Sequence, residues 1–393
     1  MTANGAEAIR QASRARAGLA VGVRRQLHRI PELAFQEVAT TRYVAAFLAE
    51  RGIPFEPSPS GTGGVAVVGR GEPVVLLRAD LDGLPVEEDT GLDFRSEHPG
   101  RMHACGHDAH AAMLLAAADA LASGEVALPG RVACVFQPAE EGPGGCLRLL
   151  EEGLLERHPA RLAFALHVWP GLPVGAVGLS PGPVMASMDR LRLAFHGRGG
   201  HGAYPHACVD PIVMAAEGVL ALQTVVSRRT DPLEPALLTV GAIRGGSAPN
   251  VIPDRVELLG TIRAYTQEVR ETLLRSIREV GEGVAAAHRG RFTCAVDEGY
   301  PVTRNDPGAA RLLGEALAQV LGADAVRPAA RTMGAEDMGF LLERVPGCYV
   351  QLGASSDPSR AEPLHSPRFD LDEACLPVGV AALLAAAWAG LTS

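Results

Sequence analysis

The sequence contains no lysine, so arginine supplies all 36 of its fixed basic side chains. That absence excludes enzymes that form a Schiff base through lysine, and it excludes P-loop nucleotide hydrolases, which need a lysine at the phosphates. An excess of positive charge is also missing, because the formal net charge is -9 at pH 7. Binding to nucleic-acid phosphates requires a basic surface, and we therefore expect no nucleic-acid partner.

A disulfide framework and a targeting segment are also lacking. The seven cysteines are scattered and odd in number, which is typical of a reducing compartment. Arg10, Arg14 and Arg16 interrupt any apolar segment that could serve as a signal peptide. The most apolar run, 376–391, contains Pro377 and is shorter than the roughly 20 residues of a membrane span, which favours a buried helix. We expect a cytoplasmic protein with no membrane partner.

At 393 residues the chain is long for one hydrophobic core, so two domains are expected. The pattern of the first part predicts helices at 7–29, 37–51, 109–122 and 145–157, and strands at 65–68, 74–77, 132–136 and 162–166, the first two as a hairpin. Three of these strands lead into acidic or imidazole side chains. In an open α/β sheet, ligands and catalytic groups collect at the carboxyl edge of the strands.

Residues 188–299 follow a different pattern. Strands and helices alternate there in the order β-α-β-β-α-β, which is a ferredoxin-like split motif. Pieces of the larger sheet flank this segment on both sides. We therefore predict an inserted second domain at 188–299 and a first domain formed by 1–187 and 300–393.

One short loop, 102–108 (MHACGHD), concentrates possible metal donors. Cys105 and His107 lie two residues apart, and Gly106 between them lets the backbone turn so that both donors can reach one ion. Asp108 can cap or brace the helix that follows. The alternative interpretation is a reduced core cysteine beside ordinary surface histidines, and the Cys-x-His spacing alone does not decide between the two.

The rest of the chain supplies further donors of the same kind. The candidate metal ligands are Cys105, His107, one of Glu140 and Glu141, His167 and His365. Thiolate, imidazole and carboxylate groups together suit Zn, Co, Ni or Mn better than Mg or Ca. Five donors exceed the number that one tetrahedral ion uses, so we predict two divalent metal ions that share a donor.

The carboxylate pair Glu140 and Glu141 allows a division of roles. One side chain can bind metal while its neighbour acts as general base on a metal-activated water and later protonates a leaving amine. The alternative is a solvated surface pair, but the position after an apolar strand and Pro138 favours function.

Four other polar residues near these positions are given lesser roles. Asp80 and Asp82 are expected to orient ligands or the loop and not to bind metal directly. His103 and His110 are equally compatible with surface positions and are left outside the predicted site.

Several sequence blocks together resemble the M20 metallopeptidases, in particular the amidohydrolases of the hippurate hydrolase and indole-3-acetyl-amino-acid hydrolase type. They are 78–85 (RADLDGLP), 102–108 (MHACGHD), 137–142 (QPAEEG), 200–206 (GHGAYPH), 250–253 (NVIP), 260–263 (GTIR) and 334–337 (GAED). The resemblance extends over nearly the whole chain, and the blocks are specific in combination although no single one is.

The resemblance implies a fold and a set of residue roles. The fold is a mixed-sheet α/β catalytic domain of the zinc-peptidase type, with the ferredoxin-like α+β insertion as a lid that also mediates dimerisation. By position, the metal ligands are Cys105, His107, Glu141, His167 and His365; the general base is Glu140; His201 stabilises the oxyanion, in related enzymes from the neighbouring subunit; and Asn250 and Arg263 hold the substrate carboxylate. Many M20 peptidases have a histidine where this chain has Asp80, which leaves the role of Asp80 open.

The activity implied is hydrolysis of the amide bond of an N-acyl amino acid, with hippurate-like or N-acetyl amino acid substrates, by two divalent metal ions and Glu140. One alternative is a dipeptidase or carboxypeptidase of the same family. Another is a catalytically silent protein that binds acyl amino acids, which would be expected to have lost Glu140 or a metal donor. The acyl group, the metal and the choice between dimer and tetramer are not determined by the sequence.

Overall fold

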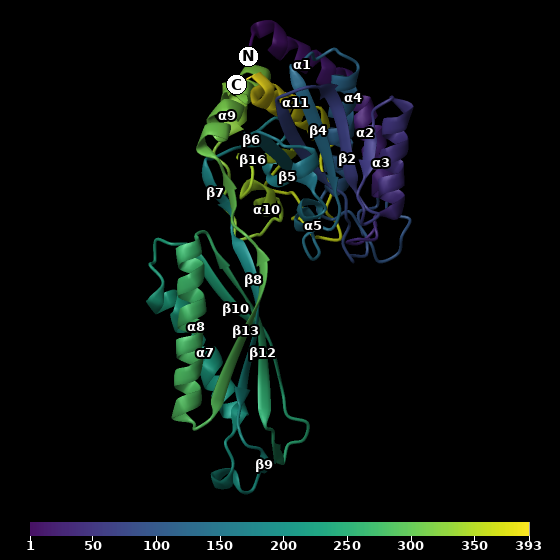
Figure 1. Ribbon diagram of the computed structural model, residues 1–393. Coiled ribbons are helices and arrows are strands. Elements are labelled where there is room, and N and C mark those ends of the chain that lie inside the picture. Colours follow the sequence, from purple (N-terminus) through teal and green to yellow (C-terminus); the bar gives the residue numbers. More distant parts are fainter. Residues whose placement is uncertain (393) are drawn as a thin grey trace. The chain divides into compact units, whose positions relative to one another are not determined.

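The computed structural model describes residues 1–392. The chain divides into two compact units (Figure 1). Unit 1 comprises Met1–Val184, Arg304–Ala330 and the chain from Asp337 onward, and unit 2 comprises Met185–Thr303 and Arg331–Glu336. The chain leaves and re-enters unit 1 through β7 (Gly182–Met185) and β14 (Thr303–Asn305), which pair as a two-stranded ribbon.

Unit 1 is built on an eight-stranded mixed sheet in the order β1-β2-β4-β3-β5-β16-β6-β15. The strands are β1 (Phe55–Pro57), β2 (Gly64–Arg70), β3 (Val74–Asp80), β4 (Gly130–Gln137), β5 (Leu162–Pro173), β6 (Val177–Gly178), β15 (Val326–Arg327) and β16 (Gly347–Ser355). The central strands β4, β3, β5 and β16 run parallel to one another, so their carboxyl ends share one edge. The predicted mixed α/β fold is confirmed.

The predicted hairpin between the first two apolar strands is wrong. In the structure β4 lies between β2 and β3, antiparallel to β2 and parallel to β3. Every residue of β3 is buried, and a strand buried on both faces belongs in the middle of a sheet with partners on both sides. The partner comes from a distant part of the chain, so the short connection between β2 and β3 did not decide the pairing.

Helices pack around this sheet. They are α1 (Ala3–Ala15), α2 (Ala17–His28), α3 (Val38–Glu50), α4 (His107–Ala122), α5 (Gly145–Glu151), α6 (Leu154–Arg157), α9 (Pro307–Leu321), α10 (Met338–Leu342) and α11 (Cys375–Thr392), with a short 3₁₀ turn η2 (Ala323–Ala325). The single helices predicted at 7–29 and 145–157 are each divided, at Arg16 and at Gly153. Gly153 adopts φ 85°, a left-handed conformation that ends a helix readily.

Helix α11 is the most apolar element. Among residues 1–392 it is the one helix whose length and composition would allow it to cross a membrane, but 78% of it is buried inside the protein. It packs against α1, α4 and α9, and a Cβ at Gly379 would lie 2.0 Å from the sulfur of Met113. The expected buried terminal helix is therefore present.

Unit 2 contains a four-stranded antiparallel sheet in the order β10-β12-β8-β13, with two helices against one face (Figure 1). The elements are β8 (Ser187–His196), α7 (Pro211–Arg229), β10 (Ala236–Gly245), β12 (Arg255–Ala264), α8 (Gln267–Ala287) and β13 (Arg291–Tyr300), with β9 (Gly200–His201), η1 (Pro205–Ala207) and β11 (Val251–Ile252) in the connections. This is the predicted ferredoxin-like order. Phe195, Leu258 and Ile277 lie in its core.

Candidate metal centre

The loop before α4 is shaped by one glycine. Gly106 has φ 82°, and a Cβ there would lie 2.4 Å from Cγ2 of Val168 in β5. Only glycine allows the loop to pass this close to the strand. As a result Cys105 and His107 are buried beside β5, with the Cys105 sulfur 3.4 Å from Nε2 of His167.

The turn after β4 is fixed by two carboxylates from other elements. Asp82 accepts hydrogen bonds from the backbone N–H groups of Glu140 and Glu141, at 3.1 and 2.9 Å. Ala139 adopts the unusual φ of 54°, and its N–H donates to Oε1 of buried Glu37 at 2.8 Å. Sequence reasoning missed Glu37, because nothing in its local pattern connects it to a turn a hundred residues away.

His365 also adopts a left-handed conformation, with φ 67°. Its backbone N–H donates to the carbonyl oxygen of Ala104 at 2.8 Å, which ties this loop to the Cys105 loop. Its Nε2 lies 3.0 Å from Oε1 of Glu141, and its side chain is 52% exposed. The site is therefore deep at Cys105 and open to solvent at His365.

Two overlapping groups of donor atoms contain the predicted ligands. In one, the donors of Cys105, His107 and His167 all lie within 4.8 Å of one another. In the other, the donors of Cys105, Glu141 and His365 do so. Cys105 belongs to both groups, and together they contain the five ligands predicted from the sequence.

His107 tests whether these residues fit a metal. Its Nδ1 is 3.1 Å from Oδ1 of Asp82, while its buried Nε2 has no hydrogen-bond partner among the described residues. A metal-binding histidine has this arrangement, with one nitrogen held by a carboxylate and the other directed at the ion. Burial lowers the pKa of His107, but Asp80 and Asp82 outweigh burial and raise the pKa to about 10. The pocket thus favours a cation at this imidazole, and the residues fit a divalent metal.

Cys105 is consistent with the same conclusion. Burial, together with the carboxylates of Glu141 and Glu140, raises the pKa of the Cys105 thiol well above its usual range. A thiol in this surrounding ionises only when a cation compensates its charge. Metal binding is therefore expected to release a proton from the site.

The histidines that were left outside the predicted site are not on the surface. His103 and His110 are both 1% exposed. His110 lies three residues after His107 in α4, a spacing that places both on one helix face and that could have identified it from sequence. Its ring nitrogens contact Asp80 and the backbone of Val168.

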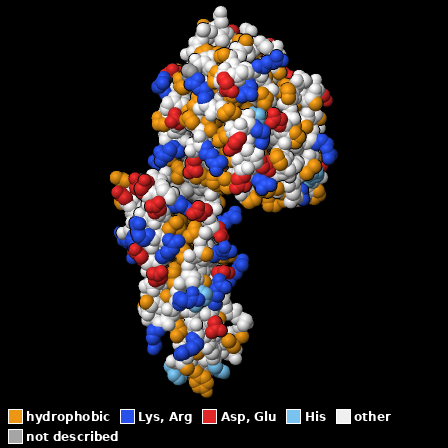
Figure 2. Space-filling view, viewed as in Figure 1, with side chains coloured by type: hydrophobic (Ala, Val, Ile, Leu, Met, Phe, Trp, Pro, Cys, Tyr) orange, Lys and Arg blue, Asp and Glu red, His pale blue; other side chains and the backbone are white. Residues whose placement is uncertain are grey.

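Three predicted residues belong to unit 2. His201 pairs with Val251 in the β9–β11 ribbon, and the N–H of Gly202 donates to the carbonyl oxygen of Asn250 at 2.8 Å, so His201 and Asn250 share one loop tip. Tyr204 and Val251 are exposed there, and Figure 2 shows hydrophobic and histidine side chains gathered at this tip.

Arg263 lies elsewhere in unit 2. It is near the carboxyl end of β12, and its guanidinium donates to the carbonyl oxygen of Met333 at 2.8 Å. The ribbon with Asn250 joins β12 at its other end, next to Arg255. At about 3.3 Å per strand residue the two ends are roughly 26 Å apart. One chain therefore does not bring Asn250 and Arg263 together.

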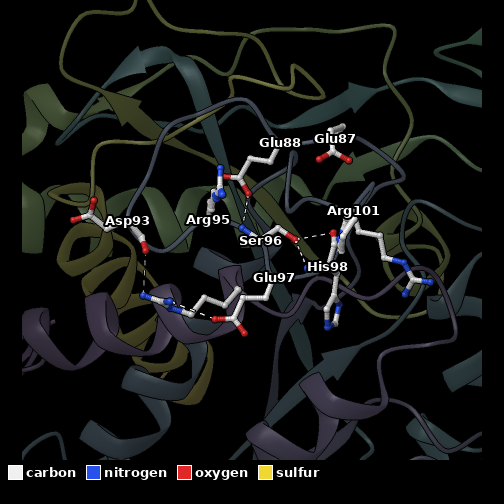
Figure 3. A pocket seen from close by; sticks show the side chains of 10 residues that line it. Glu87, Glu88, Asp93, Arg95, Ser96, Glu97, His98 and Arg101 are labelled. Carbon is white, nitrogen blue, oxygen red and sulfur yellow. Dashed lines mark hydrogen bonds and ion pairs between the residues drawn. The ribbon is translucent and has the colours of Figure 1, made fainter.

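A separate polar hollow of about 550 Å³ lies in the loop between β3 and α4 (Figure 3). None of the predicted metal ligands lines it. Glu88 accepts from the N–H of Ser96 at 2.7 Å, and Arg29 lies 3.4 Å from Glu97. The residues that line the hollow contribute no group of converging metal donors.

The fold and the donor set define a metal-dependent hydrolase. The model of peptidase family M20/M25/M40 matches residues 76–389, and the chain belongs to this family. An N-acetyl-L-cysteine deacetylase of Bacillus subtilis is 41% identical over 358 residues, covering 91% of this chain and 84% of the relative. An IAA-amino acid hydrolase of Arabidopsis thaliana is 38% identical over 366 residues, covering 91% and 82%.

Solved structures agree with this assignment. A putative aminohydrolase from methicillin-resistant Staphylococcus aureus superposes with a TM-score of 0.93 at 32% identity, covering 98% of this chain and 100% of the other. A dinuclear metal-binding peptidase of the M20 family from Bacillus subtilis superposes with a TM-score of 0.85 at 34% identity, covering 96% and 99%. The family resemblance seen in the sequence is confirmed.

Proposed function

We propose that this protein hydrolyses the amide bond of N-acyl amino acids with two divalent metal ions. The observation that carries the proposal is the pair of donor groups that share Cys105, because a shared donor suits two neighbouring ions. The thiolate, imidazole and carboxylate donors together suit Zn, Co, Ni or Mn. The cysteines of the described chain are all free, and we place the protein in the reducing environment of the cytoplasm.

The metal ions would supply polarisation of the amide carbonyl and a lowered pKa for the attacking water. Glu140 would accept the proton of that water and pass it to the departing amine. Its carboxylate lies within 4.8 Å of the donor atoms of His107 and Glu141, and its side chain is 6% exposed. Asp82 holds the backbone of both glutamates, which keeps the base and the ligand in fixed positions.

The substrate class follows from the named relatives and from Arg263. The relatives act on N-acetyl-L-cysteine and on an IAA-amino acid, both of which join an acyl group to an amino acid. Arg263 is half-buried, and a guanidinium can bind an α-carboxylate through two parallel hydrogen bonds. We propose N-acyl amino acids over dipeptides, and the preserved Glu140 and metal donors do not favour a silent binding protein.

The protein is proposed to act as a homodimer with active sites built from two chains. Asn250 and Arg263 are assigned to one substrate carboxylate, yet they lie at opposite ends of the unit 2 sheet. Both residues reach the same carboxylate if the β9–β11 loop tip, which carries His201 and Asn250, is supplied by a second copy of the chain. The edge strand β10 and the exposed apolar side chains of Ile212, Leu220 and Ile243 offer a surface for that copy.

Mixing two inactive variants tests this two-chain site. Glu140→Gln and His201→Ala are each expected to be inactive alone. After subunit exchange, half of the dimers would pair the two variants and contain one intact site, so about a quarter of wild-type activity should return. Mixing Glu140→Gln with Glu141→Gln is the control, because both changes affect the same half of the site. No recovery in the first mixture, with exchange verified, would contradict a shared site.

Amine release from acetyl, benzoyl, indole-acetyl and succinyl amino acids tests the activity itself. Chelator-stripped protein should be inactive, and Zn, Mn, Co or Ni should restore hydrolysis because the donor set holds such ions. Dipeptides serve as the comparison. Faster cleavage of dipeptides would move the protein to the dipeptidase alternative, and inactivity with metal bound would remove the proposal.

Arg263→Ala should lower kcat/KM for carboxylate-bearing substrates roughly 10- to 100-fold. This loss corresponds to one charge-assisted hydrogen bond, which contributes about 1.5–3 kcal/mol. The matched comparison is an analogue whose carboxylate is replaced by an amide, for which the variant and the wild type should be nearly equal. Equal losses for both substrates would show that Arg263 acts through structure and not through the carboxylate.

A further inference from the structure

His110 is a buried imidazole to which the mechanism above gives no task. Its Nε2 lies 2.9 Å from the backbone nitrogen of Val168, which can only donate, so Nε2 accepts that hydrogen bond. Its Nδ1 lies 2.6 Å from Oδ1 of Asp80. With Nε2 occupied as acceptor, the ring proton is on Nδ1 and is donated to Asp80. Both nitrogens are therefore used, and the orientation of the ring is fixed.

Asp80 is saturated by its neighbours. Oδ1 accepts from His110, and Oδ2 accepts from the guanidinium of Arg78 at 2.8 Å. Arg78 in turn donates to Asp337 and Gln137 at 2.8 Å each. The donor atoms of Asp80, His107 and His110 lie within 4.8 Å of one another, but the hydrogen bonds already made by Asp80 and His110 mark a network and not a further metal site.

The network ends on a predicted metal ligand. Val168 follows His167, and Nδ1 of His167 lies 2.7 Å from the carbonyl oxygen of Val168. That oxygen can only accept, so Nδ1 carries the proton and Nε2 is left as the metal-facing atom, 3.4 Å from the Cys105 sulfur. The Val168 N–H donates to His110, while the Val168 carbonyl oxygen accepts from His167. His110 therefore fixes the residue that sets the orientation of the His167 ring. The two rings are 4.5 Å apart between centroids.

We propose that His110 and Asp80 are positioning residues that hold the Nε2 atom of His167 toward the metal pair. Asp80 anchors His110, His110 anchors the Val168 backbone, and Val168 sets the tautomer of His167. This inference rests on the proposed metal site, and it gives Asp80 a role that the sequence left open. Residues of this kind typically change metal affinity about 10- to 100-fold when they are replaced.

The test is cobalt affinity in the absence of substrate, followed by the visible absorption of bound Co(II). His110→Asn keeps an N–H near the position of Nδ1 but loses the acceptor for Val168, whereas His110→Gln keeps an acceptor near the position of Nε2. We expect the affinity of one cobalt to fall about 10- to 100-fold in His110→Asn with an altered spectrum, and to be partly restored in His110→Gln. The melting temperature of each metal-free variant measures general destabilisation.

His158→Asn is the matched control. His158 is also a buried histidine, but it lies before the other end of β5, where its Nε2 is 3.4 Å from Glu56. Equal cobalt affinities for His110→Asn, His110→Gln and His158→Asn would overturn the positioning role. The positioning role would also be overturned if the wild type bound three cobalt ions per chain and the His110 variants bound two, because His110 would then belong to a metal site of its own. Wild-type protein that binds no cobalt would instead refute the proposed function.

Discussion

Glu140→Gln is expected to lose turnover by about 10²- to 10⁴-fold, the usual contribution of a positioned general base, while it keeps its metal content. The amide has nearly the shape of the carboxylate, but it cannot accept a proton from the attacking water. The Glu140 backbone N–H is bound by Asp82, so the turn should keep its geometry. The measurements are kcat at saturating substrate and metal content of the same sample.

Glu141→Gln is the matched control for this prediction. It makes the same chemical change one residue further along, at a side chain whose Oε1 lies 3.0 Å from His365 and which shares a donor group with Cys105. We expect it to lose metal and turnover together, with excess metal restoring part of the activity. If Glu140→Gln were the variant that lost metal, the roles of the two glutamates would be exchanged.

Arg78→Met is expected to destabilise unit 1 by about 3–5 kcal/mol, because it removes a buried cation that is shared by two buried carboxylates. The guanidinium lies 2.8 Å from both Asp80 and Asp337, and all three side chains are at most 1% exposed. Methionine fills a similar volume, so the loss of charge compensation dominates over the loss of packing. The free energy of unfolding of metal-free protein in urea measures the effect.

Two further variants test whether the loss of stability in Arg78→Met comes from the loss of charge compensation. Arg311→Met removes an arginine whose side chain is 65% exposed and whose partner Glu315 is 61% exposed, so it should change stability by less than about 1 kcal/mol. Adding Asp337→Asn to Arg78→Met should recover part of the stability, since it removes the negative charge of one of the two carboxylates that Arg78 contacts. An equal effect of Arg78→Met and Arg311→Met would show that water reaches the Arg78 network.

The gathering of donors at one edge could be predicted because it depends on a general property of parallel sheets. Strands β3, β4 and β5 run parallel, so Asp80 and Glu140 come to the same edge from positions sixty residues apart, and His167 lies there within β5. The order of secondary structure in unit 2 could also be predicted, because its strands and helices each have a clear periodic pattern in the sequence and are separated by turn residues. The roles of the ligands themselves stay predictions.

The pairing of β2 and the network around Arg78 could not be predicted. Local turn signals suggested that β2 pairs with β3, but the buried position between them is taken by β4, whose place depends on packing over the whole sheet. Asp337 and Arg78 are 259 residues apart in the sequence, and no local sequence pattern predicts their contact. His110 was missed for a simpler reason, because its spacing of three residues from His107, which places both on one face of α4, was not used.

The ribbon of β7 and β14 has a consequence for how the chain folds. It brings together the two ends of a long inserted segment, and closing a loop of that length costs conformational entropy that grows only as its logarithm, by about 0.6 kcal/mol per doubling. Unit 2 has its own hydrophobic core, and all of its chain precedes β16 and α11, so it can form while these two elements are still being synthesised. Once it has formed, its two ends leave from adjacent strands, and the nascent chain of unit 1 then has only a short gap to close before β5 and β16 pair.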